Sequence, residues 1–430
     1  MRGTKSVTDG KLPLLFASLF ICQSAGAAAP GVTAAPAKFS YLGMINESES
    51  RIGAPAVFAR LEAMQPEEQV TFAKTHRAHF DRLRTMRSLA GDATGAAQAS
   101  VWFDIADGAL SRHAASKSGE LDTVVPDDAV QAIVREARNR RIVILNEAHH
   151  VPVHRVFASR LASELRKIGY TYLAAEAFAP GVPAHPATPR QVDGFYVREP
   201  MYASFVRSAI RDGWTFVAYD HVSTEASTPA ERSRLREVGA ARNLVERIFS
   251  KNPEAKVFMY VGYGHAQEMP KAGPNGYTTV ATVLKESTGL DPLTIDQASM
   301  YGRGDVRVDL PRYRAAMQRF APGKPVVFKT ASRGYVLDSS RPGYDMQVFH
   351  PDETAHGPHG RPLWMERQAG LKPHPVPAGL LPANGRRLIQ AFHAGDGEGA
   401  IPVDQVMVEA GKPAASLMLP DGQFRFGYEE

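Results

Sequence analysis

Cysteine is almost absent from this 430-residue chain, whose single cysteine is Cys22. One thiol cannot form an intrachain disulfide, so a fold held together by disulfides is excluded, as is a structural metal site built from several thiolates. Cys22 also lies in an N-terminal segment that we expect to be removed, which would leave the mature chain without a thiolate nucleophile. The fold must therefore be stabilised by its hydrophobic core.

Long apolar runs and dense basic patches are also missing. Beyond the N-terminus, no segment contains the run of roughly 18 apolar residues that a membrane-spanning helix needs. The formal net charge is only +5, and no cluster of Lys and Arg is interleaved with aromatic residues, so nucleic-acid binding is not indicated. With 44% hydrophobic and 22% charged residues, the composition is that of an ordinary globular protein.

The first 29 residues have the pattern of a secretory signal peptide. Basic residues precede the apolar stretch LPLLFASLFICQSAGAAAP, in which small residues at Ala27 to Ala29 mark a cleavage site. The apolar core is short for a bilayer span, although a retained anchor is the alternative. We expect export to the periplasm or the exterior, with no membrane anchor after cleavage.

Apolar runs that are typical of buried strands alternate with amphipathic segments over residues 126–340. The expected strands are RIVILNE, YTYLAAEAF, WTFVAYDH and AKVFMYVGYGH, with weaker ones at DPLTIDQ and KPVVFKT. Continuous apolar strands separated by helices indicate a parallel sheet covered on both faces. We therefore predict an α/β fold with a mostly parallel sheet flanked by helices.

The N-terminal flank of this region is expected to be helical. Residues 30–125 should form a loose lead-in, then one or two amphipathic helices between 56 and 89, then a polar loop over 91–120. These helices should pack on the main domain.

The C-terminal flank divides into two segments. Residues 341–383 are dense in proline and glycine, which is typical of a linker or a surface wrap. Three histidines there, His350, His356 and His359, are expected on a flexible loop without fixed ligand geometry. Residues 384–430 alternate like short antiparallel strands with turns between them, which predicts a small β module that packs on the main domain.

Four consecutive predicted strands each end in a carboxylate or an imidazole. These residues are Glu147, followed by His149 and His150, then Glu176, Asp220 and His265. In parallel α/β sheets, ligands bind beyond the carboxyl ends of the strands. We therefore expect these side chains to share one cleft.

Such a cleft suits two kinds of chemistry. Carboxylates and imidazoles can hold a divalent metal such as Mn²⁺, Zn²⁺ or Co²⁺, with Glu147, His149 and His265 as ligands. Alternatively, a histidine paired with a carboxylate can deprotonate water directly. Structural roles stay open for some of these residues, because strand-end carboxylates often pair with arginines and His154 is expected to be solvated in a first helical turn.

Two stretches resemble a known family. VILNEAHHVPVHRVFASRLASELRKIGYTYLAAE resembles the opening motif of the erythromycin esterase/ChaN/Tiki superfamily, and REVGAARNLVERIFSKNPEAKVFMYVGYGH resembles its later half. The resemblance implies the site residues Glu147, His149 or His150, Glu176 and His265, with weaker matches at Asp220, His154, Glu237 and Arg242. Asn146 stands where the family usually has glycine, and we expect it to crowd the backbone at the site.

The resemblance implies several functions. Esterase-like members look like metal-independent hydrolases, Tiki-like members are metal-dependent proteases, and ChaN-like members bind haem. We therefore expect an exported hydrolase that activates water against an ester, lactone or amide in a small-molecule or peptide substrate. The alternatives are a periplasmic haem- or iron-binding protein without catalysis and a degenerate scaffold. The sequence does not determine the oligomeric state.

Overall fold

The computed structural model describes residues 39–430, apart from 55, 111–117, 269–277, 332–333 and 336–341. The expected signal peptide and the first part of the lead-in lie outside the described residues. Within the described part, no helix combines the length and the apolar character that a bilayer span requires.

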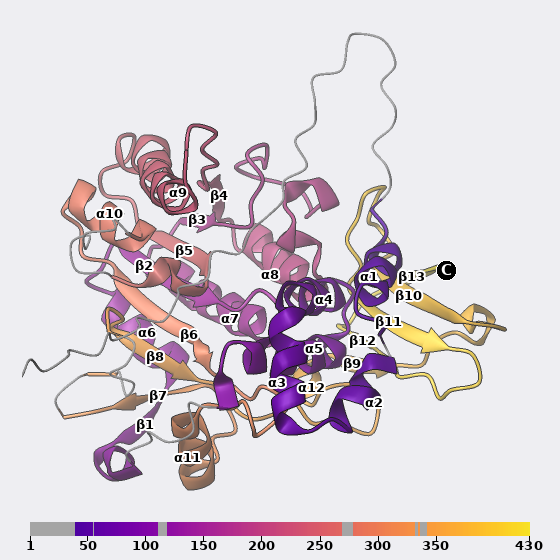
Figure 1. The fold of residues 1–430 in the computed structure, drawn as a ribbon. Coiled ribbons are helices and arrows are strands. Elements are labelled where there is room, and N and C mark those ends of the chain that lie inside the picture. The colour runs from indigo at the N-terminus through magenta and orange to yellow at the C-terminus, as the bar shows by residue number, and fades with distance from the viewer. Residues whose placement is uncertain (1–38, 55, 111–117, 269–277, 332–333, 336–341) are drawn as a thin grey trace, which may run out of the picture. The chain divides into compact units, whose positions relative to one another are not determined.

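An eight-stranded sheet forms the centre of the fold (Figure 1). The strands are β1 (Val125–Asp128), β2 (Ile142–Glu147), β3 (Tyr172–Ala175), β4 (Thr215–Ala218), β5 (Val257–Gly262), β6 (Leu293–Met300), β7 (Val326–Lys329) and β8 (Met346–Phe349). Their order is β1-β7-β8-β6-β2-β5-β3-β4. The five pairs from β8 to β4 are parallel, and β7 and β1 add antiparallel strands at one edge. The predicted α/β fold with a mostly parallel sheet is therefore confirmed.

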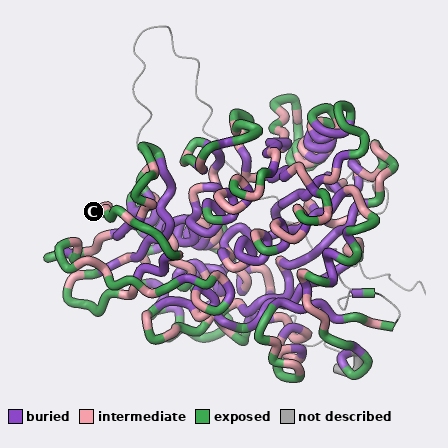
Figure 2. Tube along the Cα trace, turned by 180° about the vertical axis from the view of Figure 1, so that it is seen from behind, coloured by how far each residue is buried: buried purple, intermediate pink, exposed green. Residues whose placement is uncertain are grey.

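Helices cover both faces of this sheet, because successive strand residues point to opposite faces. On one face Leu145 and Tyr260 belong to a core with α6 (Ala129–Ala137), α7 (Val153–Lys167) and α8 (Pro200–Arg211). On the other face Ile144 and Met259 belong to a core with α9 (Pro229–Leu244) and α10 (Val280–Thr288). Figure 2 shows buried residues along the central strands and exposed ones on the outer turns. Burial on both faces explains why the strands have continuous apolar sequences.

The N-terminal region is more helical than predicted. Its helices are α1 (Tyr41–Ser50), α2 (Ala56–Glu62), α3 (Pro66–Thr75), α4 (Arg77–Leu89) and α5 (Ala93–Ala106). Thus α1 occupies part of the predicted lead-in, and α5 occupies the segment that we predicted as a loop. Alanine-rich α5 has high helix propensity, but it is buried around Trp102 and Phe103 and on other sides as well. It therefore lacks the one-sided apolar pattern on which the prediction depended.

Two further boundaries differ from the predictions. The segment PDDAVQAIVREARNR has the apolar spacing of one helix, but it begins with β1, and α6 begins only after Asp128, whose side chain accepts a hydrogen bond from the Gln131 N–H. The predicted linker contains β8, α12 (Trp364–Arg367) and β9 (Lys372–His374). The helix α11 (Pro311–Phe320) precedes β7.

The predicted C-terminal β module is confirmed. Strands β10 (Arg386–His393), β11 (Asp404–Glu409) and β13 (Phe424–Glu429) form an antiparallel sheet in the order β11-β10-β13, whereas β12 (Leu417–Leu419) pairs with β9. Leu388 of β10 packs in one apolar cluster with residues of α1 and α4. Residues 39–430 form one compact unit.

Candidate active site

The polar strand ends meet at the carboxyl edge of β2, β5 and β3. Glu147, the last residue of β2, lies opposite Gly262, the last residue of β5. Glu176 follows β3, and its N–H donates to the Tyr260 carbonyl of β5 at 3.1 Å. A 3₁₀ turn after β5 (Tyr263–Ala266) then carries His265. The parallel register therefore brings residues from three distant parts of the sequence together, as the strand-end pattern predicted.

Glu147 and His149 form the first histidine–carboxylate pair. The His149 Nδ1 lies 2.8 Å from Glu147 Oε1, and Glu147 also accepts hydrogen bonds from Arg155 and from the Tyr260 hydroxyl at 2.8–3.2 Å. Burial by itself would raise the pKa of Glu147, but Arg155 and His149 lower it to about 2. The His149 ring also stacks on Tyr196, with centroids 3.9 Å apart. His149 is therefore held in one orientation by an ionised carboxylate.

Glu237 and His265 form the second pair. The His265 Nδ1 lies 2.7 Å from Glu237 Oε1, and Glu237 Oε2 accepts the N–H of Val280, the first residue of α10. Burial opposes the charge on His265, but the carboxylates of Glu237 and Glu176 raise its pKa to about 9. At neutral pH His265 is therefore an imidazolium held by a buried glutamate.

Glu176 lies between the two histidines. Its Oε1 is 4.0 Å from His149 Nε2 and 3.9 Å from His265 Nε2. The same oxygen accepts a 2.6 Å hydrogen bond from Arg236 Nη2, and Oε2 accepts the Gly262 N–H. Despite burial, the pKa of Glu176 is lowered strongly by His265 and Arg236. One carboxylate thus connects both histidine–carboxylate pairs.

Asp220 serves this arrangement indirectly, because both of its oxygens accept hydrogen bonds of 2.8 Å from Arg236. A bidentate pair of this kind fixes the plane of the guanidinium. Arg236 can therefore direct an N–H group at Glu176, while its Nη1 lies 3.4 Å from His265 Nε2, so two cationic groups flank the same carboxylate. Asp220 is thus a strand-end carboxylate that pairs with an arginine, as the sequence left open, and this ion pair lies within the site.

Gly262 allows the close approach of the two pairs. A Cβ atom at this position would lie 2.4 Å from His149 Nε2 and 3.0 Å from Glu176 Oε2. Both separations are far shorter than the carbon contact distances of about 3.5–4.0 Å in packed proteins. Any side chain at Gly262 would thus have to displace His149 or Glu176.

The choice between the adjacent histidines is resolved in favour of His149. His150 points elsewhere, with its Nε2 2.9 Å from Ser100 Oγ of α5 and its Nδ1 3.3 Å from the Tyr263 hydroxyl. Burial and the nearby Arg84 hold the pKa of His150 well below its usual value. His150 is therefore a neutral, hydrogen-bonded side chain next to the site.

Two weaker candidates lie outside the cluster. His154 is in the first turn of α7, as predicted, but it is fully buried instead of solvated, and its Nδ1 accepts the Ala148 N–H at 3.1 Å. Burial lowers its pKa well below the usual value. Arg242 is exposed on α9, so this match was wrong, whereas Glu237 on the same helix does reach the site.

Asn146 does not crowd the site, contrary to our expectation. It precedes Glu147, so its side chain lies on the opposite face of β2. There its Nδ2 donates to the Tyr263 carbonyl at 2.8 Å, and its Oδ1 accepts the Gln297 N–H at 2.8 Å. Tyr263 adopts a left-handed conformation with φ of 38°, which is uncommon for a residue other than glycine. Asn146 therefore fastens a strained turn beside the site.

The proposed metal ligands do not fit a metal. A carboxylate offers about four lone-pair positions, and Glu147 already accepts four hydrogen bonds. Between Glu176 and His265, the cationic group is the Arg236 guanidinium. Among the described residues, no group of three or more His, Cys, Asp or Glu side chains could hold a metal ion. We therefore derive no step through a metal.

The cavities near the site are small. One of about 10 Å³ lies beside Glu176, Arg236 and His265, which is space for about one water molecule or one substrate oxygen. A second, of about 60 Å³, lies beside His150.

Two arginines and one tyrosine at the site were not predicted. Arg236 directly precedes Glu237, but only the packing of α9 on the sheet directs its guanidinium at Glu176. Arg155 and Tyr260 bind Glu147 from α7 and β5. Since the strand-end pattern selects carboxylates and imidazoles, it could not identify cations on helices or a tyrosine within a strand.

Comparisons with known proteins add little. No protein-family model and no curated protein sequence matches the chain. Among solved structures, the type III effector HopBA1 is similar at 17% identity and a TM-score of 0.29, covering 42% of this chain and 86% of that one. The MARTX toxin effector domain RRSP from Vibrio vulnificus is similar at 16% identity and a TM-score of 0.28, covering 50% and 44% of the two chains. Likenesses this low carry no argument about function.

Proposed function

We propose that this protein is an exported hydrolase that activates water with His149 and cleaves an ester, a lactone or an amide without a metal. One observation carries the proposal. Two imidazoles, each held by its own buried glutamate, direct their Nε2 atoms at the same oxygen of Glu176, at 4.0 and 3.9 Å. Clusters of ionisable groups whose pKa values are shifted by specific charged partners are typical of functional sites.

His149 is the general base in this proposal. Its Nδ1–H donates to ionised Glu147, so the tautomer leaves the Nε2 lone pair free. The proposal places a water molecule at hydrogen-bond distance from both His149 Nε2 and Glu176 Oε1, which are 4.0 Å apart. Glu176 orients this water, and its low pKa keeps it ionised without making it a strong base.

His265 and Arg236 stabilise negative charge. Both are cations at neutral pH, and both line the small cavity of about 10 Å³. An oxygen that becomes negative there would meet two fixed donors, which is the arrangement that stabilises a tetrahedral intermediate.

The steps then follow. His149 Nε2 takes a proton from water, and the hydroxide oxygen bonds to the substrate carbonyl carbon while the C=O electron pair moves to the carbonyl oxygen. The oxyanion lies between Arg236 and His265. When the C–O or C–N bond breaks, the carbonyl re-forms and the imidazolium of His149 returns the proton to the leaving group. The products are an acid and an alcohol or an amine, and His149 is neutral again.

Two features of the sequence also support the proposed function. The N-terminal pattern supports export, and the motifs around Glu147, His149, Glu176 and His265 support a relationship to the erythromycin esterase/ChaN/Tiki superfamily. The Nε2 atom that the His149 tautomer leaves free, together with the four hydrogen bonds that Glu147 already accepts, favours the metal-independent, esterase-like chemistry within that family.

The test is hydrolysis by purified protein of p-nitrophenyl esters, γ- and δ-lactones and aryl amides, with and without EDTA. We expect turnover that EDTA does not change. The variants His149→Gln and Glu176→Gln should each lose at least about 100-fold in kcat, since positioned acid–base groups contribute that much. His185→Gln replaces an exposed histidine and serves as the control. If no substrate is cleaved, or if both site variants keep the wild-type rate, the proposal is wrong.

A further inference from the structure

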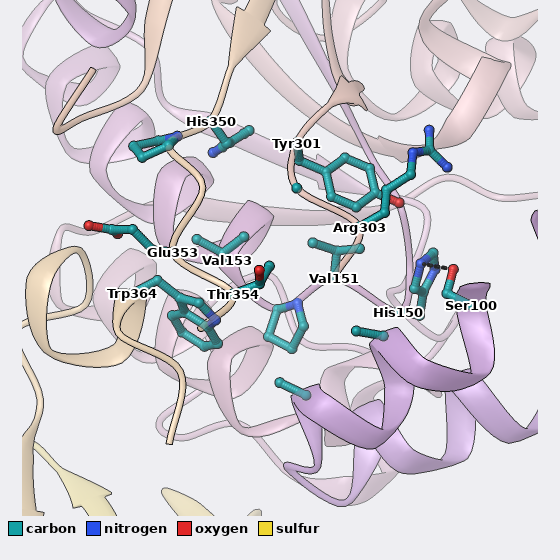
Figure 3. A pocket seen from close by; sticks show the side chains of 15 residues that line it. Ser100, His150, Val151, Val153, Tyr301, Arg303, His350, Glu353, Thr354 and Trp364 are labelled. Carbon is teal, nitrogen blue, oxygen red and sulfur yellow. Dashed lines mark hydrogen bonds between the residues drawn. The ribbon is translucent and has the colours of Figure 1, made fainter. Parts of the chain in front are cut away.

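A second pocket, of about 60 Å³, lies next to the site. It is formed by α5, by the loop after β2, and by the segments that follow β6 and β8. Figure 3 shows His150 with Ser100 at one end and Trp364 with Glu353 at the other. A cavity needs about 10–15 Å³ to hold one water molecule and one of about 150 Å³ holds benzene, so this pocket can accept a group of a few heavy atoms.

The lining of this pocket favours an uncharged apolar group. Ala93, Ala97, Val151 and Trp364 contribute apolar wall. Arg303 also lines it, but its charge is balanced by Asp104 at 2.8 Å. Glu353 lines it as well and accepts a 2.7 Å hydrogen bond from Gln368 Nε2, so both charged side chains have partners within the protein. The other polar lining residues are uncharged, and a mixture of apolar wall and placed polar groups is typical of a ligand site.

His350 lines this pocket as a neutral ring, and its nitrogen that lacks a partner among the described residues is enclosed by the protein. Gln297 Nε2 donates to the His154 carbonyl, so Gln297 Oε1 must accept from His350 Nε2–H at 3.1 Å. Burial lowers the pKa of His350 to about 3, so the ring is neutral and its Nδ1 is an acceptor. Nδ1 has no hydrogen-bond partner among the described residues, although His350 is 1% exposed. The expected flexible histidine loop is therefore wrong for His350.

The pocket is connected to the catalytic residues by shared neighbours. His150 lines the pocket, and His149 directly precedes it in the sequence. Tyr263 contacts both, since its ring packs edge-on against His149 and its hydroxyl lies 3.3 Å from His150 Nδ1. The pocket is therefore adjacent to the proposed catalytic residues through His150 and Tyr263.

The two cavities differ in volume and therefore suit different parts of a substrate. The cavity beside His265 has about 10 Å³ and takes one oxygen, whereas the pocket beside His150 has about 60 Å³. The remainder of a substrate must lie outside the smaller cavity, and the larger one opens at the same sheet edge. In parallel α/β folds this edge is where ligands bind.

We infer that the pocket lined by Ala97, His150, His350 and Trp364 is the recognition subsite of the proposed hydrolase. It holds a short, branched, uncharged group of the acyl part, about the size of isobutyl. The inference rests on the proposed function, but binding at the pocket can be measured without turnover.

Binding is tested with 3-methylbutan-1-ol, which has the branched group and a hydroxyl but no bond to hydrolyse. Saturation-transfer NMR on the full chain should detect it, and ethanol should bind at least tenfold more weakly. Ala97→Phe fills the pocket from α5 and should weaken binding at least tenfold. Ala93→Leu narrows it from the same helix and should act in the same direction. Ala63→Phe makes the same change as Ala97→Phe at an exposed alanine outside the pocket and should have no effect.

Turnover gives the second measurement. The kcat/KM ratio of p-nitrophenyl 3-methylbutanoate to p-nitrophenyl acetate should exceed ten in the wild type and fall at least tenfold in Ala97→Phe. Probe binding without any hydrolysis would contradict the proposed function and leave the pocket assignment intact. Hydrolysis with an equal ratio in the wild type and in Ala97→Phe would overturn the pocket assignment alone, as would probe binding that Ala97→Phe and Ala93→Leu do not weaken.

Discussion

At the scale of single residues, the site depends on close contacts between groups that are all buried. Each carboxylate has a cation or an N–H donor beside it, so charge is balanced locally at Glu147, Glu176 and Glu237. Burying an unbalanced charge costs several kcal/mol. A substitution that displaces one of these side chains without removing its charge should therefore lower the rate of the proposed reaction more than it lowers the stability of the fold.

Gly262 gives the sharpest test of this expectation. We expect Gly262→Ala to lower kcat about 100-fold, because a Cβ 2.4 Å from His149 Nε2 must move the base, and a displacement of about 1 Å can cost that much. Circular dichroism should show that the variant is folded. Gly181→Ala, where a Cβ would meet no atom within 4 Å, is the matched control. Equal rates for the two variants would contradict the assigned position of His149.

The raised pKa of His265 predicts a pH dependence. Activity that needs the imidazolium should fall as the pH rises through about 9. The sign for stability is the same. A histidine whose folded pKa lies above its unfolded value of 6.5 stabilises the fold fully below pH 6.5 and loses that contribution as the pH rises through about 9.

Glu237→Gln should move the fall in activity at high pH, the alkaline limb of the pH profile, to lower pH. The substitution removes the nearest negative charge from His265 and so lowers its pKa. The pH profile of kcat/KM and the titration of the His265 Cε1–H signal by NMR both measure the shift. Glu246→Gln changes an exposed glutamate in the next turns of the same helical segment and should leave the limb in place. An unshifted limb in Glu237→Gln would show that His265 is not the titrating group.

The residue identities at the site were only partly predictable from the sequence. Glu147, Glu176 and His265 could be predicted, because parallel strands put their ends on one edge. The choice of His149 over His150 could not, since it depends on Ser100 of α5, a helix that the pattern did not reveal. Arg236 could not be predicted because its role follows from the packing of α9.

At the scale of elements, α7 is fixed to the sheet by one buried arginine. Arg155 is fully buried and binds Glu147 of β2 and Glu199, the N-cap of α8, at 2.8–2.9 Å. One cation thus balances two carboxylates from two other elements. Burial raises the pKa of Glu199, so this carboxylate depends on Arg155 for its charge.

We expect Arg155→Met to lower the free energy of unfolding by about 3–5 kcal/mol, because it leaves uncompensated buried carboxylates. The deficit should be largest at neutral pH and shrink on acidification. Without Arg155 the folded-state pKa values of the two glutamates lie above their unfolded values, so protonation favours the fold. Urea unfolding at pH 7 and pH 5 measures both effects. Arg211→Met removes an exposed arginine and should cost less than about 0.5 kcal/mol. A pH-independent deficit would contradict this account.

The elements themselves were predictable to different degrees. Strands β2 to β7 were predictable because burial on both faces gives them long apolar sequences. Helix α5 was not, because it is buried on most sides and has no polar face to set a period. Strand β8 was missed because it is only four residues long and lies among prolines and glycines.

At the scale of the whole molecule, the C-terminal module is joined to the remainder by buried polar contacts. Asp404 of β11 binds Arg361 at 2.9 Å, and Gln405 donates to the Leu89 carbonyl of α4 at 2.8 Å. Glu429 of β13 accepts the Leu42 N–H of α1 at 2.9 Å. These contacts predict that the module and the α/β fold unfold together.

Tryptophan fluorescence tests this coupling, because the three tryptophans, at positions 102, 214 and 364, all lie outside residues 384–430. Asp404→Ala leaves Arg361 buried without its partner and should lower the Tm that tryptophan fluorescence reports, by several degrees for a loss of about 3 kcal/mol. Asp421→Ala, an exposed residue of the same module, should leave that Tm unchanged. An unchanged tryptophan transition in Asp404→Ala would show that the module unfolds independently.

The adjacency of His149 and His150 has a consequence for engineering. In the proposed assignment, recognition at His150 and proton transfer at His149 are separated by one peptide unit, so we expect that the loop after β2 cannot be redesigned for a new substrate without disturbing His149. The opposite wall of the pocket, on α5 and after β8, has no such restriction. Libraries that vary Ala93, Ala97 and Thr354 should yield altered selectivity at retained turnover, whereas libraries in residues 148–152 should mostly yield inactive protein.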